Sequence, residues 1–236
     1  MKPSGQDEIN YLDFFRGGVP AGAIFYMNLG GLRELVKKRF KLRAHFSVQS
    51  EVCLIGVVSY FEAFCGDHFA SILNICPQLL VRLKKNGRDV SLDATDLLEV
   101  GLQSTHIGSI VAERYDFGTP QSINSLYQHL LQITPFSTQE RKRYEQILND
   151  RNLLVHHGGI STMKYSKQSS LVAKSVHYDS ISVSQADFLE VAGFLESIVH
   201  KTVKASHARL VEFMEQQPIS PSKVQEKAIH ALLWVD

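Results

Sequence analysis

A dense apolar run in the first half of the chain constrains the fold more than any other feature. Over residues 52–73 apolar side chains occupy more than one side of a helix, and Pro77 ends the run. Residues 47–51 supply the polar side chains typical of a helix N-terminus. A helix that is apolar on several sides is buried on several sides, so we expect this one at the centre of a bundle.

Capping signals and amphipathic spacing predict further helices. Ser137 and Glu140 form the Ser-x-x-Glu pattern of a capping box, and the Gly-Gly pair at 158–159 is a C-terminal stop, which predicts a helix over 140–157. Ser184 begins another amphipathic helix that runs to about residue 216. Weaker helical segments are expected over 32–45, over 91–115 with a break near Gly101, over 123–131 and over 224–234.

Two segments lack helical periodicity. Residues 1–30 mix aromatic side chains with glycine, and we expect them to be irregular or to include a short helix packed on the main body. Residues 160–184 are polar with short alternations, as in a small hairpin or an ordered loop. The sequence therefore predicts an all-α, up-and-down helical bundle of about four to six helices with a small irregular or hairpin insertion. We divide it into an N-terminal extension with a basic helix (1–44), the bundle (45–216) and a C-terminal tail (217–236).

Composition narrows the class of protein. With 25 basic and 24 acidic residues the formal charge is +1, so contact with nucleic acid must come from a local patch. Cys53, Cys65 and Cys76 lie in or beside the apolar run and are expected to be buried thiols in a reducing compartment. The N-terminus lacks an apolar signal core and we expect no stretch of the ~18 apolar residues of a membrane span, which favours a cytoplasmic protein without a membrane partner.

One candidate patch is the polar face of the helix expected over 32–45. We interpret that face either as a solvated basic surface or as a patch that follows the phosphates of an RNA. Its basic residues are Arg33, Lys37, Lys38, Arg39, Lys41 and Arg43.

The end of the helix over 140–157 gathers the polar residues with the clearest chemical potential. Arg151 falls within its apolar stripe, which is costly unless the guanidinium has a partner or the stripe faces a groove. Asn152 and His156 are four residues apart and share a flank. Arg151 and His156 differ by about 140° around the axis and by about 7.5 Å along it. Within one helix the two side chains therefore cannot both contact the same substrate atom. Two copies related by a two-fold axis could, which favours a composite dimeric site.

These residue types suit a phosphodiester. A neutral histidine takes a proton from a ribose 2′-OH, and a guanidinium binds phosphate oxygens and the charge that develops on them. We assign catalysis to Arg151 and His156, and substrate binding or orientation to Asn152, His157 and Glu62, the last lying on the apolar helix in an aromatic environment. The histidines show no metal-ligand spacing, and the chemistry requires no metal or other cofactor.

The segment RNLLVHH resembles the Arg-polar-x-x-x-His signature of the HEPN superfamily (higher eukaryotes and prokaryotes nucleotide-binding). The order of segments is also similar: an aromatic-rich helix with SYFEAF at 59–64, a connector with INSLYQHL at 123–130, then a capped helix that ends in RN and VHHGGI. The resemblance covers roughly residues 47–215 and is closest to stand-alone bacterial proteins of the RiboL-PSP and MAE-like groups.

The resemblance implies a metal-independent endoribonuclease that works as a homodimer and leaves a 2′,3′-cyclic phosphate and a 5′-OH. Such proteins act as toxins or in antiviral defence and have an antitoxin or regulatory protein as a further partner. Gly158 stands where the subgroup paired with nucleotidyltransferase antitoxins has a tyrosine, so we do not predict that pairing.

Two alternatives compete with this reading. A non-catalytic HEPN-like dimer would bind RNA or a protein through the same face, and a plain helical scaffold would do neither. In that last case Arg151 is a structural arginine bonded to helix-end carbonyls, and His156 and His157 are cations that favour the helix C-terminus.

Overall fold

The computed structural model describes residues 9–38, 48–93, 95, 104–160 and 181–234. These residues form eight α-helices and three short 3₁₀ segments and contain no β-strand, which confirms the predicted all-α bundle. The helices are α1 (Ala21–Lys37), α2 (Val48–Ile75), α3 (Leu79–Lys85), α5 (Ile107–Ala112), α6 (Pro120–Leu131), α7 (Thr138–His157), α8 (Gln185–Glu215) and α9 (Lys223–Ala231). The 3₁₀ segments are η1 (Tyr11–Phe14), η2 (Arg16–Gly18) and η3 (Ser104–His106).

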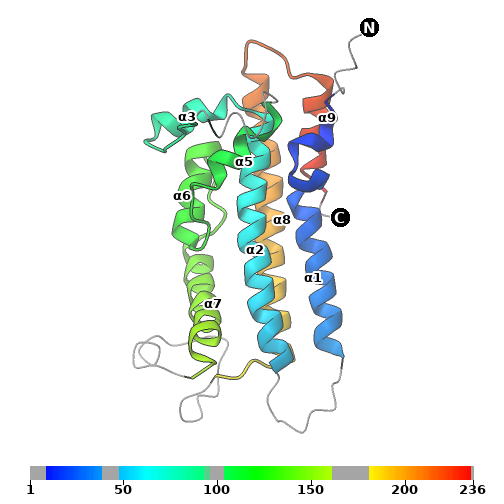
Figure 1. Ribbon diagram of the computed structural model, residues 1–236, viewed down its shortest axis with the longest axis vertical. Helices are drawn as coiled ribbons and strands as arrows, with labels where there is room; N and C mark the ends of the chain where they lie inside the picture. Colours follow the sequence, from blue (N-terminus) through cyan, green and yellow to red (C-terminus); the bar gives the residue numbers. More distant parts are fainter. Residues whose placement is uncertain (1–8, 39–47, 94, 96–103, 161–180, 235–236) are drawn as a thin grey trace.

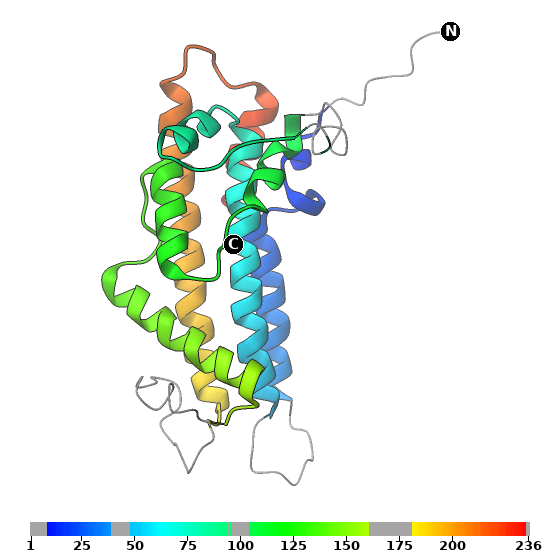
Figure 2. The same cartoon turned by 60° about the vertical axis from the view of Figure 1, so that its left-hand side comes forward.

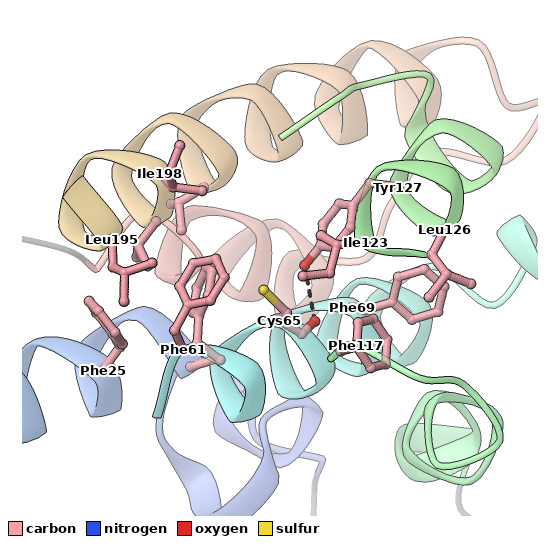
Figure 3. Close-up of a cluster of buried hydrophobic side chains, with 14 of the residues drawn as sticks. Phe25, Phe61, Cys65, Phe69, Phe117, Ile123, Leu126, Tyr127, Leu195 and Ile198 are labelled. Carbon is pink, nitrogen blue, oxygen red and sulfur yellow. Dashed lines mark hydrogen bonds between the residues drawn. The ribbon is translucent and has the colours of Figure 1, made fainter. Parts of the chain in front are cut away.

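Helix α2 is the centre of the bundle, as its apolar run predicts. It contacts α1, α5, α7, α8 and α9, and α1, α2 and α8 run side by side along the long axis (Figures 1 and 2). Figure 3 shows the core around it, where Phe25 of α1, Phe61 of α2 and Leu195 of α8 meet. Farther along, Tyr127 of α6 donates a 3.1 Å hydrogen bond to the main-chain oxygen of Cys65.

Helix α1 joins two segments that the sequence separates. It begins at Ala21, within the stretch expected to be irregular or to hold a short packed helix, and continues into the helix expected over 32–45. Phe25 and Leu29 lie one turn apart and are buried against the bundle, while a side chain at Gly30 or Gly31 would meet open space. A helix interior glycine costs about 1 kcal/mol, so packing on α2 and α8 outweighs the poor local propensity.

The basic face expected over 32–45 is partly neutralised. The helix ends at Lys37, and Arg39, Lys41 and Arg43 lie outside the described residues. Arg33 donates two hydrogen bonds, of 3.1 and 2.7 Å, to the carboxylate of Glu196 on α8. Lys37 pairs with Glu34 at 2.9 Å. Of the described basic residues of this face, Arg33 and Lys37 are therefore paired with carboxylates, and Lys38 is exposed just beyond the end of the helix.

Other boundaries follow local signals. Ser137 and Ser184 both cap their helices in complete capping boxes, and Gly158 ends α7 at φ 58°, the left-handed conformation that glycine adopts most easily. The residues around the predicted break at Gly101 and most of the predicted insertion lie outside the described residues. The two ends of that insertion meet, since the N–H of Ile181 donates to the carbonyl of Gly159 at 2.8 Å.

Both predicted end regions pack on the bundle. Helix α9 contacts α8, α2 and η1, with Ala228 and Ile229 buried, and α1 lies along α2. Helix α5 crosses α2 at Gly108, where an added Cβ would lie 2.2 Å from the main-chain oxygen of Ala70. The N–H of Gly108 donates to Asn74 Oδ1 at 2.7 Å, so this crossing requires a glycine.

Helix α2 also has the length and composition of a membrane span, with a mean hydropathy of 1.3 over an 18-residue window. This differs from the expectation that no stretch reaches that length. Core helices of water-soluble bundles pass the same test, and 44% of the window is buried within this chain. The cytoplasmic location therefore stays a prediction.

Candidate functional site

The site is built on the last turns of α7, where that helix passes α2. Helix α7 crosses the lower bundle obliquely (Figure 2), so its buried side turns along its length. Tyr144 and Ile147 face the core, and near the end Leu153 and Leu154 are buried. Val155, expected on the apolar stripe, is instead 46% exposed because the buried side has turned toward Leu153 by then.

An ion pair between α7 and α2 holds the central arginine. Arg151 Nη2 donates to Glu62 Oε1 at 2.6 Å, and Arg151 Nη1 donates to Asn152 Oδ1 at 3.0 Å. The side chains of Arg151 and Glu62 are 18% and 24% exposed, so the pair is largely removed from water. These partners are side chains and not helix-end carbonyls, which distinguishes the arrangement from the structural arginine considered for the sequence.

Burial acts against the charge of this pair. Burial raises the pKa of Glu62, while the neighbouring Arg151 guanidinium lowers it and Asp116 raises it further; the net direction is upward. Desolvation therefore exceeds the attraction between the partners, as is common for buried ion pairs. In the described part of the chain, the buried Nε of Arg151 also lacks a hydrogen-bond partner. An arrangement that is costly for folding is a candidate for function.

A cleft of about 510 Å³ opens beside the pair, between α7 and the segment that leads into α6. Its polar lining combines one guanidinium, that of Arg151, with the carboxylates of Glu62, Asp116 and Glu145. Gln121 donates a hydrogen bond to Glu145 Oε1, and the N–H of Gly118 donates to Asp116 Oδ1 at 2.8 Å. The other lining residues are Thr119, Pro120, Leu148, Asn149 and Asn152. The cleft is therefore acidic and rich in hydrogen-bond acceptors.

His156 lies on the flank of α7 that lines the cleft, but beyond its end. Glu145, Asn149, Asn152 and His156 follow one another at spacings of four, three and four, which places them within about 60° around the axis. The first three line the cleft, whereas His156 is exposed and does not. His157 is exposed as well, about 100° around the helix from His156.

The structure thus brings together Glu62, Arg151 and Asn152 and leaves His156 and His157 outside the cleft of the same chain. Sequence reasoning did not single out Asp116, Glu145 or Asn149. The spacing of Glu145 and Asn149 relative to Asn152 on α7 was a usable signal, since all three share one flank. Asp116 offered none, because it lies in a connector whose path only the tertiary structure fixes.

Next to the site, one face of α2 carries exposed apolar side chains at its N-terminal end. Residues at spacings of four, three, four and three lie within about 80° around this helix. In Figure 1 the lower half of α2 stands in front of α8, between α7 and α1. Val48 and Val52 are 58% and 53% exposed, and the same stripe ends at Glu62 of the ion pair. The stripe, called the open α2 face below, comprises Val48, Val52, Ile55, Ser59 and Glu62.

Within the residues that the structure describes, no three His, Cys, Asp or Glu side chains are placed to share a metal ion. Comparison of the chain with protein families, with curated proteins and with solved structures finds no match. The resemblance to HEPN proteins therefore rests on the motif and the order of segments alone.

Proposed function

We propose that the chain is a metal-independent endoribonuclease of HEPN type whose active site forms between two copies. The observation that carries the proposal is the arginine of the motif, held by Glu62 at the edge of a cleft. His156 lies one turn beyond Asn152, on the flank of α7 that lines this cleft. A buried, oriented guanidinium is suited to bind a phosphate and to stabilise charge on its oxygens.

The reaction needs a base for the ribose 2′-OH and an acid for the leaving 5′-oxygen. The 2′-oxygen attacks phosphorus, the bond from phosphorus to the 5′-oxygen breaks, and the products are a 2′,3′-cyclic phosphate and a 5′-OH. His156 accepts the proton from the 2′-OH, and a water molecule of the solvent donates one to the leaving oxygen. Asn152 and His157 orient the RNA, and Glu62 orients Arg151.

The second copy supplies what one chain lacks. Along one helix Arg151 and His156 are separated by about 7.5 Å and about 140°, so they cannot converge on one phosphate. The open α2 face adjoins the ion pair and has the four-three spacing by which helices pack against each other. Two copies that pack through this face bring their sites together, and Val155, exposed on α7 one turn beyond Arg151, adds apolar surface.

In this proposal the protein is cytoplasmic and acts as a toxin or an antiphage effector, restrained by an antitoxin or another regulatory protein. The alternative is a non-catalytic HEPN-like dimer that binds RNA or a protein. One observation favours that alternative: His156 lies outside the cleft, and the three carboxylates of the cleft repel phosphate.

The test is cleavage of labelled single-stranded RNA and tRNA in EDTA, with end-group identification. We expect the wild type to leave 2′,3′-cyclic phosphates, and His156→Ala to be slower by about 10²–10⁴-fold, the usual contribution of a general base. His230→Ala is the matched control, since His230 is an exposed histidine in the last turn of α9 at the other end of the bundle. Equal cleavage by wild type and His156→Ala would reject the enzymatic role, and dependence on Mg²⁺ would reject the mechanism.

A further inference from the structure

The acidic lining of the cleft is unexpected in a protein that handles RNA, and it limits what can enter. Three carboxylates and one guanidinium line the cleft, and that guanidinium already pairs with Glu62. A phosphate inside the cleft would face a net negative charge, so it binds at the Arg151 edge and not in the interior. The volume of about 510 Å³ lies within the range of about 300–1,000 Å³ of small-ligand pockets.

A neutral group rich in N–H donors fits this interior. An unpaired RNA base next to the bound phosphate is such a group, and proteins commonly read unpaired bases on their Watson–Crick edges. Each carboxylate can accept hydrogen bonds at about four lone-pair positions. Within the cleft, Glu145 accepts one hydrogen bond from Gln121, and Asp116 accepts one from the N–H of Gly118. Both carboxylates therefore keep acceptor capacity for a ligand.

The four bases differ in what they offer to a carboxylate. Guanine presents adjacent N1–H and N2–H donors, which match the two oxygens of a carboxylate. Cytosine and adenine present a single amino group, and carboxylates accept from such groups. Uracil presents one N–H between two carbonyl oxygens, and these oxygens are repelled. The acceptor-rich lining thus ranks guanine first and uracil last.

We infer that this cleft is a base-specificity subsite that takes one unpaired nucleotide beside the scissile phosphate and prefers guanine, read by Glu145 and Asp116. The inference rests on the proposed ribonuclease function and adds the substrate preference of the same site. Asn149 and Asn152, on the same flank as Glu145, complete the polar wall with amide groups that both donate and accept.

Binding of four single-stranded RNAs tests the inference separately from catalysis. The RNAs are identical except for A, C, G or U at one central position, and a 2′-deoxynucleotide at each potential cut blocks cleavage. We expect the guanine RNA to bind about tenfold to a hundredfold more tightly than the uracil RNA, the range of one bidentate base contact. Glu145→Gln and Asp116→Asn should each reduce that ratio to about threefold or less. Glu212→Gln, which removes a carboxylate of an exposed pair on α8, should leave it unchanged.

The cleavable RNAs complete the test. Cleavage next to guanine that is lost in His156→Ala supports both the function and the inference. Cleavage without base preference, or equal dissociation constants for the four RNAs, overturns the inference but not the proposed function. A cationic side chain of a protein would then be the better ligand for the carboxylates of the cleft. Guanine-selective binding without any cleavage supports the subsite and rejects the catalytic role. Absence of RNA binding overturns both.

Discussion

The Glu62–Arg151 ion pair is the contact on which the site depends, and a double-mutant cycle measures its strength. The variants are Glu62→Ala, Arg151→Ala and the double variant. Removing one partner of a fully buried pair costs about 3–5 kcal/mol, whereas exposed pairs contribute about 0.2–1 kcal/mol. Because the two side chains are 18% and 24% exposed, we expect each single variant to lose about 2 kcal/mol of unfolding free energy and the coupling to be about 1–2 kcal/mol.

The matched control is the pair Arg209–Glu212 on α8. Its N–O distance of 2.7 Å is close to the 2.6 Å of Glu62–Arg151, but its side chains are 47% and 52% exposed. We expect a coupling of no more than about 0.5 kcal/mol for this pair. Urea unfolding monitored by circular dichroism gives all the required free energies. A coupling between Glu62 and Arg151 no larger than that of the control would refute the claim that Glu62 holds the guanidinium.

The same pair predicts a pH dependence whose sign is opposite to that of an ordinary salt-bridged carboxylate. The pKa of Glu62 is raised above its usual value of 4.5, chiefly by burial. The folded state thus binds the proton more tightly than the unfolded state, so this contribution to stability is present below about pH 4.5 and is lost as the pH rises through the folded pKa. Glu62→Gln should remove this contribution. An unchanged pH profile of its urea midpoint relative to wild type would contradict the assignment.

Three further outcomes test other parts of the structure. Burial lowers the pKa of His68 to about 3, so between pH 6.5 and 3 the imidazole is protonated in the unfolded state and not in the folded state. The wild type should therefore lose about 2 kcal/mol of unfolding free energy between pH 7 and 5. In urea titrations His68→Leu should lose less over the same range. Gly108→Ala should lower the unfolding free energy by about 1–3 kcal/mol through overpacking. Gly193→Ala in α8, where a Cβ meets open space, should leave it unchanged or raise it by up to about 1 kcal/mol. Equal urea midpoints for the two variants would contradict the close crossing of α5 and α2. Val52→Glu should shift the proposed dimer to monomer in analytical ultracentrifugation, whereas Val81→Glu on α3, where Val81 is 59% exposed, should not. A reversed or equal effect would remove the open α2 face as the interface.

The sequence predicts the elements whose signals are local. The capping boxes at Ser137 and Ser184 and the Gly-Gly stop after α7 depend on side chains within a few residues, and the structure places these helix ends where the sequence predicts them. The long apolar run likewise identifies α2 as the central helix. The first half of helix α1, from Ala21 to Gly31, lacks such a local signal, because its stability comes from contacts with α2 and α8, which override its glycines.

The residues of the site are likewise predictable from the sequence only where the signal is local. Arg151 could be selected from the sequence because a cation in an apolar stripe demands a partner. Glu62 could be named as a candidate, but its pairing with a residue 89 positions away follows only from the packing of α7 on α2. The acidic cleft was not predicted, since Asp116 and Glu145 come from segments that helical spacing cannot relate.

Complementation between two inactive variants tests the composite site most directly. Arg151→Ala and His156→Ala are purified separately, mixed under conditions that allow subunits to exchange, and assayed for RNA cleavage in EDTA. If the arginine of one copy works with the histidine of the other, each mixed dimer holds one complete site, and random exchange should restore about a quarter of wild-type activity. No activity above that of the parent variants, with mixed dimers demonstrated, would contradict a site shared between two chains.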